Sequence, residues 1–342
     1  MDPLSHVLLG ASLGYTAFAR KIGRTGAWVG GLAAFIPDAD IFIRSKTDPL
    51  LAIEYHRHFT HALLFAPIGA ALVAAIALLR PGHRPQALAL WGCATFAYLS
   101  HCFLDAATSY GTQLLWPFSN QRFGGDVISI IDPIFTLTLA IALTWSLINQ
   151  RRRPAVVGLI FGLGYLALGV TQHARAAAAQ AALAHARGHA REHFEVMPTM
   201  GNNLVWRALY IHRGRIHSDR IRVGWFASPT ARSGWSLPVV RPGDLRPAEA
   251  ARNQHRSFER FAWFSDGWVG RSPNDESVLG DMRYSLSAEA FDPIWGIRFT
   301  ASTAPVEIAW VNRTRDRKVN PAELWHEIIG RDPRFLPLDD VR

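Results

Sequence analysis

The 342-residue chain lacks several features that would assign it quickly to a class. It has only two cysteines, Cys93 and Cys102, which form no CxxC pair. No cleavable signal peptide follows Met1, so we expect uncleaved membrane spans to provide the targeting. Residues 1–173 hold 12 Lys and Arg against 8 Asp and Glu, and residues 174–342 hold 24 against 19. Because this net charge of +9 is spread evenly and no basic block is interleaved with aromatics, no nucleic-acid partner is expected.

Charged residues are also missing from three long apolar stretches, 62–79, 87–104 and 155–172. Each has 18 residues without Lys, Arg, Asp or Glu, close to the ~20 that cross a bilayer as a helix. Three further apolar segments are shorter: 7–19, 26–36 and 134–148. We therefore predict an α-helical transmembrane bundle of about four to six helices, and a multi-pass protein of the bacterial inner membrane.

Loop charge predicts the orientation of this bundle. The short loops of one side carry eight positive charges: Arg20, Lys21, Arg24, Arg80, Arg84, Arg151, Arg152 and Arg153. Those of the other side carry four: Arg44, Lys46, Arg57 and Arg122. The positive-inside rule puts the first side in the cytoplasm. The second side, with residues 37–61, 105–130 and everything after Gln172, is then periplasmic in a Gram-negative source.

Changes in amino-acid composition along the sequence divide the chain into three parts. Residues 1–173 form the predicted membrane domain, and the Ala-rich stretch 174–192 predicts a helical stalk or linker. Residues 193–342 predict a smaller soluble domain that is β-rich or α+β. Its expected strands are 204–212, 220–227, 261–264, 296–300 and 306–311, with a helix near 321–329. It shows no metal-ligand spacing, nucleophile elbow or phosphate loop, so the sequence predicts no role for it.

Histidines and aspartates gather at the predicted outer ends of the spans. His101 and Asp105 are four residues apart near the end of one span, so both side chains lie on one helix face. This spacing presents two ligands to one metal, but it also suits a hydrogen-bonded pair that locks the helix. Asp38 and Asp40 follow Pro37 at the end of another apolar segment, where Asp40 alone could instead cap a helix.

A third group precedes the span 62–79. His56, Arg57, His58 and His61 lie within six residues, and Thr60 is a plausible N-cap for the following helix. Imidazole near a helix N-terminus favours the neutral form that binds metals. Arg57 could clamp a phosphate or carboxylate, or extend to lipid headgroups.

The predicted topology brings these groups to one side of the membrane. Seven candidate metal ligands result: His6, Asp38, Asp40, His56, His61, His101 and Asp105. Seven nitrogen and oxygen ligands exceed the need of one tetrahedral zinc and suit one or two ions. Mixed His and carboxylate ligands favour Zn²⁺, with Mn²⁺ and Fe²⁺ as alternatives, and the absence of thiolates argues against a purely structural zinc.

The order of these motifs resembles a known family. His6 to Gly10, the PDAD of residues 37–40, the HRHFTH of residues 56–61 and the HCFLD of residues 101–105 are similar to the YdjM-type membrane-bound metal-dependent hydrolases of bacteria. The resemblance covers about residues 1–172 and implies metal-site roles for Asp38, Asp40, His56, His61, His101 and Asp105. His58 falls at a variable position of the pattern. The order of ligands is also loosely similar to zinc-dependent phospholipase C.

The candidate metal ligands and the family resemblance together favour hydrolysis as the function. A metal would activate water against a lipid or lipid-linked ester or phosphoester. Asp38 or Asp105, whichever is not a ligand, would serve as general base, and Arg57 would stabilise negative charge. The HExxH motif of many metalloproteases is absent. The alternative is a non-catalytic, metal-stabilised membrane scaffold that presents the C-terminal domain.

Overall fold

The protein, described here from a computed structural model, divides into two compact units. The structure describes residues 1–342 except 247–248, 250–251, 287–290, 301–307, 317–319 and 342. The first unit comprises Met1–Phe42, Tyr55–Thr171 and Pro198–Asn203. The second comprises Ile43–Glu54, Gln172–Met197 and Leu204–Arg342. The boundary after Thr171 lies close to the predicted limit of the membrane domain, but a short segment of the N-terminal half belongs to the second unit.

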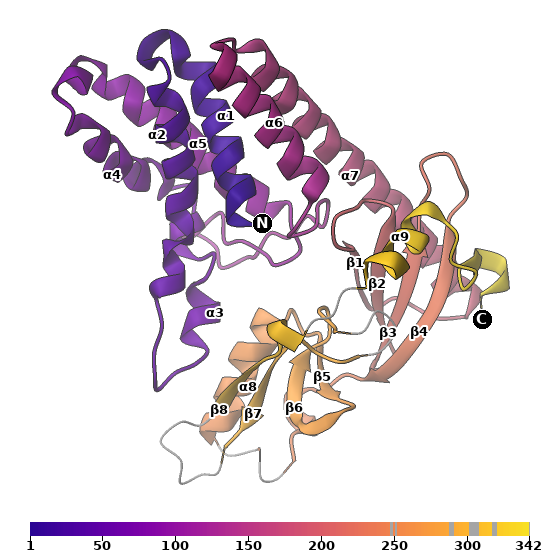
Figure 1. The fold of residues 1–342 in the computed structure, drawn as a ribbon. Helices are drawn as coiled ribbons and strands as arrows, with labels where there is room; N and C mark the ends of the chain where they lie inside the picture. Colours follow the sequence, from indigo (N-terminus) through magenta and orange to yellow (C-terminus); the bar gives the residue numbers. More distant parts are fainter. Residues whose placement is uncertain (247–248, 250–251, 287–290, 301–307, 317–319, 342) are drawn as a thin grey trace. The chain divides into compact units, whose positions relative to one another are not determined.

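The first unit is a bundle of helices (Figure 1). Its helices are α1 (Pro3–Ile22), α2 (Thr25–Phe35), α4 (Ala66–Leu78), α5 (Ala87–Ala106), α6 (Pro133–Asn149) and the first part of α7 (Arg153–Ala186). The core between α2, α4 and α5 is built from small and medium side chains such as Ala33, Ala70 and Ala94, which are fully buried. The predicted helical fold class of this half is therefore confirmed.

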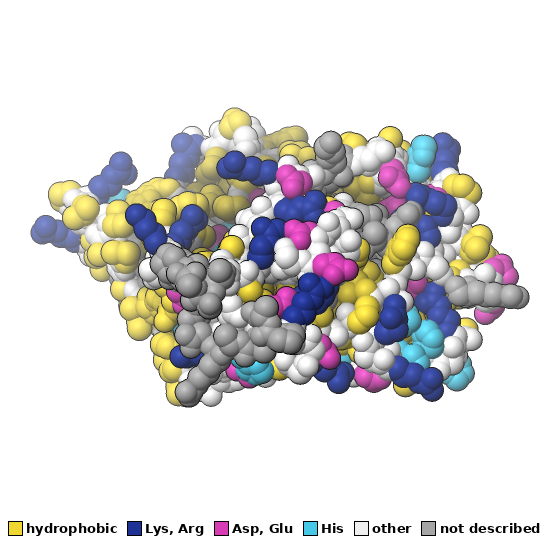
Figure 2. All heavy atoms as spheres, turned by 90° about the horizontal axis from the view of Figure 1, so that it is seen from below, with side chains coloured by type: hydrophobic (Ala, Val, Ile, Leu, Met, Phe, Trp, Pro, Cys, Tyr) yellow, Lys and Arg dark blue, Asp and Glu magenta, His cyan; other side chains and the backbone are white. Residues whose placement is uncertain are grey.

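Two helices among the described residues are long and apolar enough to cross a membrane, α7 and the helical segment Pro81–Ala106 that contains α5. A third span results if Leu51–His61 and α4, which are bent by 79° against each other, count as one. The predicted helix over 62–79 is wrong at its start, because α4 begins only at Ala66, with Pro67 in its first turn. One face of α4 exposes Ile68, Leu72 and Ile76. Exposed hydrophobic side chains also gather on the left of the view in Figure 2. Such a face suits contact with lipid.

Glycines let α1 and α2 approach each other closely. A Cβ atom added to Gly14 would lie 2.0 Å from the carbonyl oxygen of Gly26, and one added to Gly30 would lie 2.2 Å from that of Gly10. These backbone atoms cannot move away without separating the two helices. The pair α1–α2 thus packs through its backbones, as small-residue interfaces in membranes do.

We expect Gly14→Val to destabilise the bundle, because the added side chain would push α1 from α2. Overpacking of this kind costs about 1–3 kcal/mol or more. Gly164→Val is the matched control, since a Cβ there meets no atom within 4 Å. The thermal midpoint of the detergent-purified protein measures both effects. Equal midpoints for the two variants would show that the close approach is not needed.

The second unit contains two antiparallel sheets, so the prediction of a β-rich C-terminal domain is confirmed. The first sheet has the order β1-β2-β3-β4-β9, with strands His193–Pro198, Val205–His212, Arg215–Arg222, Thr230–Pro238 and Leu336–Pro337. The second has the order β5-β6-β7-β8, with strands Val269–Ser272, Asp275–Asp281, Trp295–Phe299 and Ile308–Asn312. The helices α8 (Arg252–Phe264) and α9 (Pro321–Ile329) also belong to this unit.

The end of α7 packs on the first sheet. Ala176, Ala179 and Leu183 of α7 share a buried core with Trp206 of β2 and Ile221 of β3. The Ala-rich stretch is thus helical as far as Ala186, but it is part of α7 and of the core of the second unit rather than an exposed stalk. Small alanine side chains allow the helix to lie directly on the sheet.

Two of the predicted strands differ from the structure. Residues 261–264 belong to α8, where Phe258, Phe261 and Phe264 are buried on one side with the three-residue spacing of a helix face. The expected strand 220–227 ends at Arg222, and the chain then turns through Gly224 and Pro229 into β4. The predictions near β2, β7, β8 and α9 agree with the structure within the described residues, of which 306–307 are not part.

The segment Ile43–Glu54 is held by α8 within the second unit. The guanidinium of Arg260 contacts both carboxylate oxygens of Asp48 at 3.1 and 2.8 Å. The same side chain binds the carboxylate of Glu54 at 2.5 and 2.7 Å. This segment includes most of α3 (Leu51–Tyr55), and it connects two parts of the first unit.

The stability of the second unit should fall on acidification because of His217. Its ring stacks on Tyr210 and lies 4.8 Å from the ring of His189. Burial, then repulsion from His189, Arg187 and His212 against the attraction of Asp219, lowers its pKa to about 4. A histidine whose pKa is lower when folded takes up its proton more readily when unfolded, so stability decreases as pH falls from 6.5 toward 4.

We expect this effect to be about 1–2 kcal/mol, since solvent screens a ring that is only partly buried. Chemical unfolding followed between pH 7 and pH 4 measures it. His217→Gln should flatten the decrease, whereas His185→Gln, which changes an exposed histidine of α7, should not. Identical pH profiles for wild type and His217→Gln would contradict the assignment.

Candidate metal centre

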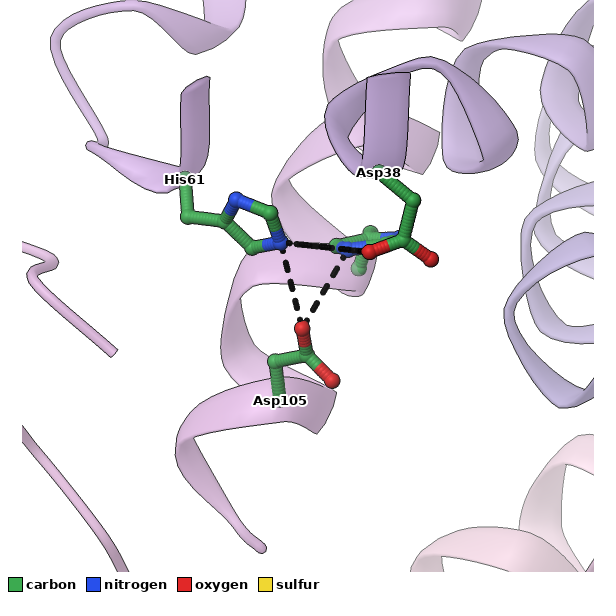
Figure 3. Close-up of side chains that lie close together, drawn as sticks. Asp38, His61 and Asp105 are labelled. Atoms are coloured by element: carbon green, nitrogen blue, oxygen red, sulfur yellow. Dashed lines mark hydrogen bonds and ion pairs between the residues drawn. The ribbon is translucent and has the colours of Figure 1, made fainter. Parts of the chain in front are cut away.

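Four side chains from three parts of the helical unit converge on one point. Asp38 belongs to the 3-10 turn Ile36–Phe42 that ends α2, and His61 ends the short 3-10 turn Phe59–His61. His101 and Asp105 are the predicted pair on α5, one turn apart. Figure 3 shows Asp38, His61 and Asp105 pointing toward one another. His61, His101 and Asp105 are completely buried, and the candidate ligand atoms all lie within 4.8 Å of one another.

The spacing of these atoms fits a tetrahedral metal ion. The two Nε2 atoms of His61 and His101 lie 2.9 Å apart, and each is 3.6 Å from Oδ1 of Asp38. Oδ2 of Asp105 lies 3.2 Å from the first and 3.4 Å from the second. Ligand atoms at the corners of a tetrahedron with bonds of about 2.0–2.1 Å are about 3.3–3.4 Å apart. The observed edges scatter around this value.

The protons on the two imidazoles support the same interpretation. Nδ1 of His101 lies 2.7 Å from the carbonyl oxygen of Ala34, which can only accept, so this nitrogen carries the proton. Nδ1 of His61 lies 3.0 Å from Oγ1 of Thr60 and 3.3 Å from Oδ2 of Asp40. Since the hydroxyl of Thr60 donates to Asp40, it accepts from His61. Once Nε2 is deprotonated, each ring therefore directs a lone pair into the cluster, the form that binds metals.

Asp105 has one satisfied and one unsatisfied oxygen. Its Oδ1 contacts Nε2 of His6 at 3.0 Å, Nη2 of Arg57 at 3.0 Å and the amino group of Met1. Its Oδ2 is buried and finds no hydrogen-bond partner among the described residues. This oxygen faces the Nε2 atoms of His61 and His101. Buried acceptors without a donor are costly, and a cation at this point would satisfy all four ligands.

A second group of potential ligands shares Asp38 with the first. It consists of Asp38, Asp40 and His56, whose ligand atoms also lie within 4.8 Å of one another. Nδ1 of His56 is 2.8 Å from Oδ1 of Asp40. The side chains of His56 and Asp38 are 27% and 16% exposed, whereas that of Asp40 is buried. The second group therefore has three protein ligands and is open to solvent, which is the arrangement of catalytic rather than structural sites.

Both carboxyls of the 3-10 turn are held in the ionised form that metals require. Burial alone would raise the pKa of Asp38, but the hydrogen bond with His61 and the charge of His101 outweigh it and lower the pKa to about 2. Burial likewise acts against ionisation of Asp40. Its hydrogen bonds with His56 and His61 prevail and hold its pKa well below the usual range.

Arg57 is buried beside Asp105 rather than extended to the surface. Its side chain is 5% exposed, and Nη1 donates to the carbonyl oxygen of Asp105 at 3.2 Å and to Oγ1 of Thr108 at 2.8 Å. The guanidinium lies over the ring of Tyr110, 4.9 Å from its centre. The backbone N–H of Arg57 donates to Oδ2 of Asp40 at 2.9 Å, with φ at +62°. Arg57 thus contacts both parts of the centre.

The structure does not bring every predicted residue into the two groups. His6 stacks on His101 with ring centres 3.7 Å apart and reaches Asp105 only at Oδ1, so a ligand role for His6 stays a prediction. The ring of His58 packs near Tyr55 and Trp116. The prediction of Thr60 as a helix N-cap is wrong, since α4 begins six residues later and Thr60 donates to Asp40 at 3.0 Å.

Comparison with known proteins agrees with the motifs. The family model of the YdjM inner membrane protein matches residues 1–176. The chain belongs to this family. The family match ends within α7, and the sheets of the second unit lie beyond it.

Two relatives share the family part of the chain. The uncharacterized protein YfhP of Bacillus subtilis (strain 168) is 31% identical over 157 residues, which cover 42% of this chain and 46% of YfhP. The inner membrane protein YbcI of Escherichia coli (strain K12) is 30% identical over 122 residues, 35% of this chain and 69% of YbcI. The chain thus spans less than half the length of YfhP. No solved structure matches the chain. Family membership and the apolar helices place the protein in the membrane.

Proposed function

We propose that the protein is a membrane-bound, metal-dependent hydrolase of a lipid or lipid-linked ester or phosphoester. The observation that supports this most is the sharing of Asp38 between a closed group and an open group of ligands. The closed group offers four buried or nearly buried ligands, which hold an ion firmly. The open group offers three ligands and leaves room for water and substrate.

The types of ligand limit which metal ions the centre would bind. Imidazole and carboxylate ligands without thiolate suit Zn²⁺, and also Mn²⁺ or Fe²⁺. When bound, such an ion supplies Lewis-acid polarisation of the ester and lowers the pKa of water at the site.

The residues of the centre would have different roles in the reaction. His61, His101 and Asp105 would fix the buried ion, and Arg57 would hold Asp105 in place as a carboxylate. Asp38 would bind both ions as their shared ligand, while His56 and Asp40 complete the open side.

The place of the centre in the chain favours a lipid substrate. His101 and Asp105 lie in the last turns of a helix long enough to span the membrane, so the ions would sit near the bilayer surface. A headgroup phosphoester lies at this level. The excess of positive charge in the loops of the opposite side supports a periplasmic location for the centre and for the C-terminal domain.

Activity of purified protein tests the proposal. The detergent-solubilised chain, loaded with Zn²⁺ or Mn²⁺, is incubated with phospholipids and lipid-linked phosphates, and release of phosphate or headgroup is measured. We expect turnover that is lost in His56→Ala and kept in His185→Ala, which changes an exposed histidine of α7. Metal-loaded protein that leaves every lipid phosphoester intact would overturn the hydrolase.

A scaffold is the second candidate, and one observation favours it. The buried group has four protein ligands, the number typical of structural sites. A scaffold predicts that metal removal lowers the thermal midpoint while no substrate is turned over.

A further inference from the structure

The loop between β3 and β4 presents two aromatic side chains to the outside. It runs over residues 223–229, VGWFASP, and carries no charged side chain. Trp225 is 58% exposed and Phe226 is completely exposed. Exposing two adjacent large aromatics to water is unfavourable by several kcal/mol at ~25 cal/mol per Å². A loop of this composition indicates a contact surface.

The backbone of this loop is fastened to α7. Nε2 of Gln172 donates to the carbonyl oxygen of Val223 at 2.8 Å. One turn further along α7, the guanidinium of Arg175 donates to the carbonyl oxygens of Gly224 at 2.8 Å and Ala227 at 3.0 Å. These bonds hold the backbone of the loop on α7 and satisfy its carbonyls, while the two aromatic side chains stay exposed.

The attachment points lie where α7 leaves its apolar stretch. The sequence from 155 to 172 contains no charged residue, and Arg175 is the first charged residue after it. The helix α7 is continuous through this point to Ala186. A level near Gln172–Arg175 therefore corresponds to the boundary between hydrocarbon and headgroups for a helix that spans the bilayer.

The β3–β4 hairpin runs along α7 with its tip at this boundary. Further from the tip, Arg187, the first residue after α7, binds Asp219 in the middle of β3 and Ser233 in the middle of β4 at 2.8 Å each. Fifteen residues separate Gln172 from Arg187, which is about 22 Å at ~1.5 Å per helical residue. Of the two ends of this hairpin, only the tip with Trp225 and Phe226 lies at the level of the bilayer surface.

We propose that residues 223–229 insert Trp225 and Phe226 into the headgroup region of the same bilayer that α7 spans. Trp is the residue most typical of this layer, because its ring is apolar and its N–H stays hydrated, and Phe can reach the first acyl carbons. The continuity of α7 from the bilayer to the loop identifies the lipid as the occupant. The insertion fixes the rim of the first sheet on the membrane, so this sheet does not swing freely at the end of a single helix.

Depth-dependent fluorescence quenching tests the insertion in the complete protein. Phe226→Cys and Trp235→Cys are labelled separately with an environment-sensitive fluorophore and reconstituted in nanodiscs of phosphatidylethanolamine and phosphatidylglycerol. Cys93 and Cys102 are fully buried, and unsubstituted protein measures their background labelling. Trp235 is the matched control, since it is 65% exposed on β4, beyond Ser233 and far from the tip.

Lipids with a spin label near the headgroup should quench the probe at 226 several-fold more than the probe at 235. Iodide in the buffer should show the opposite preference. Equal access of iodide to both positions would overturn the proposal. Protection of position 226 from iodide without quenching by spin-labelled lipid would also overturn it, because a protein surface would then cover the loop.

Discussion

Replacing Asp38 with alanine should abolish the binding of two divalent metal ions, whereas replacing His56 with alanine should leave one ion bound. Asp38 is common to both groups of ligands, while His56 belongs only to the open group. Loss of a partner that merely orients a ligand already weakens metal binding by roughly 10–100-fold, and loss of a shared ligand should weaken it more. The closed group keeps all its members in His56→Ala.

Elemental analysis of detergent-purified protein measures this difference. His58→Ala is the matched control, because His58 lies next to the centre in the sequence and in neither group. We expect the metal content of His58→Ala to equal that of the wild type. A single ion in the wild type, or identical losses in Asp38→Ala and His56→Ala, would contradict two sites that share Asp38.

Replacing Arg57 with alanine should destabilise the helical unit by less than the about 3–5 kcal/mol that an unpaired buried charge costs, because the amino group of Met1 still contacts Oδ1 of Asp105. Asp105 would lose the charge at Oδ1, and Thr108 would lose its hydrogen bond from Nη1. Metal content should decrease as well, because Asp105 is a ligand of the closed group. The thermal midpoint and the metal content, measured on the same preparation, report both effects.

A second substitution, Arg57→Gly, distinguishes the effect of losing the guanidinium from the effect of the strained backbone conformation. Arg57 has φ at +62°, a conformation that glycine adopts without strain. Arg57→Gly should therefore lose about 1 kcal/mol less stability than Arg57→Ala, although both remove the guanidinium. Unchanged midpoint and metal content in Arg57→Ala, together with lost turnover, would instead assign Arg57 to the substrate.

The fold was predictable where one local pattern dominates. Long uncharged stretches predicted the helices, and alternation of apolar stretches with turn residues predicted the β-rich half. Hydropathy alone does not give the start of α4, which is set by Pro67, a residue that favours the first turn of a helix. The aromatic composition of residues 261–264 favours a strand, but the spacing of Phe258, Phe261 and Phe264 is that of a helix.

The candidate centre was predictable in composition but not in arrangement. The pair His101 and Asp105 follows from helix geometry alone, and the structure places both in one group. Asp38 belongs to both ligand groups because two turns that are distant in the sequence meet in the fold. A local sequence pattern does not predict such a meeting. For the same reason the sequence did not reveal that Thr60 joins His61 to Asp40, although its place beside His61 was a signal.

The segment held by Arg260 has an entropic consequence for the open ligand group. Asp40 and His56 are the two ends of a loop of about 16 residues, and closing a free loop of this length costs about 2.5 kcal/mol by the (3/2)RT ln n relation. The ion pairs of Arg260 with Asp48 and Glu54 restrict the middle of that loop even when no metal is bound. These ion pairs thereby supply part of the ordering that metal binding requires of the loop between Asp40 and His56. A chain cut at the family boundary of residue 176 would keep every ligand and lose this preorganisation.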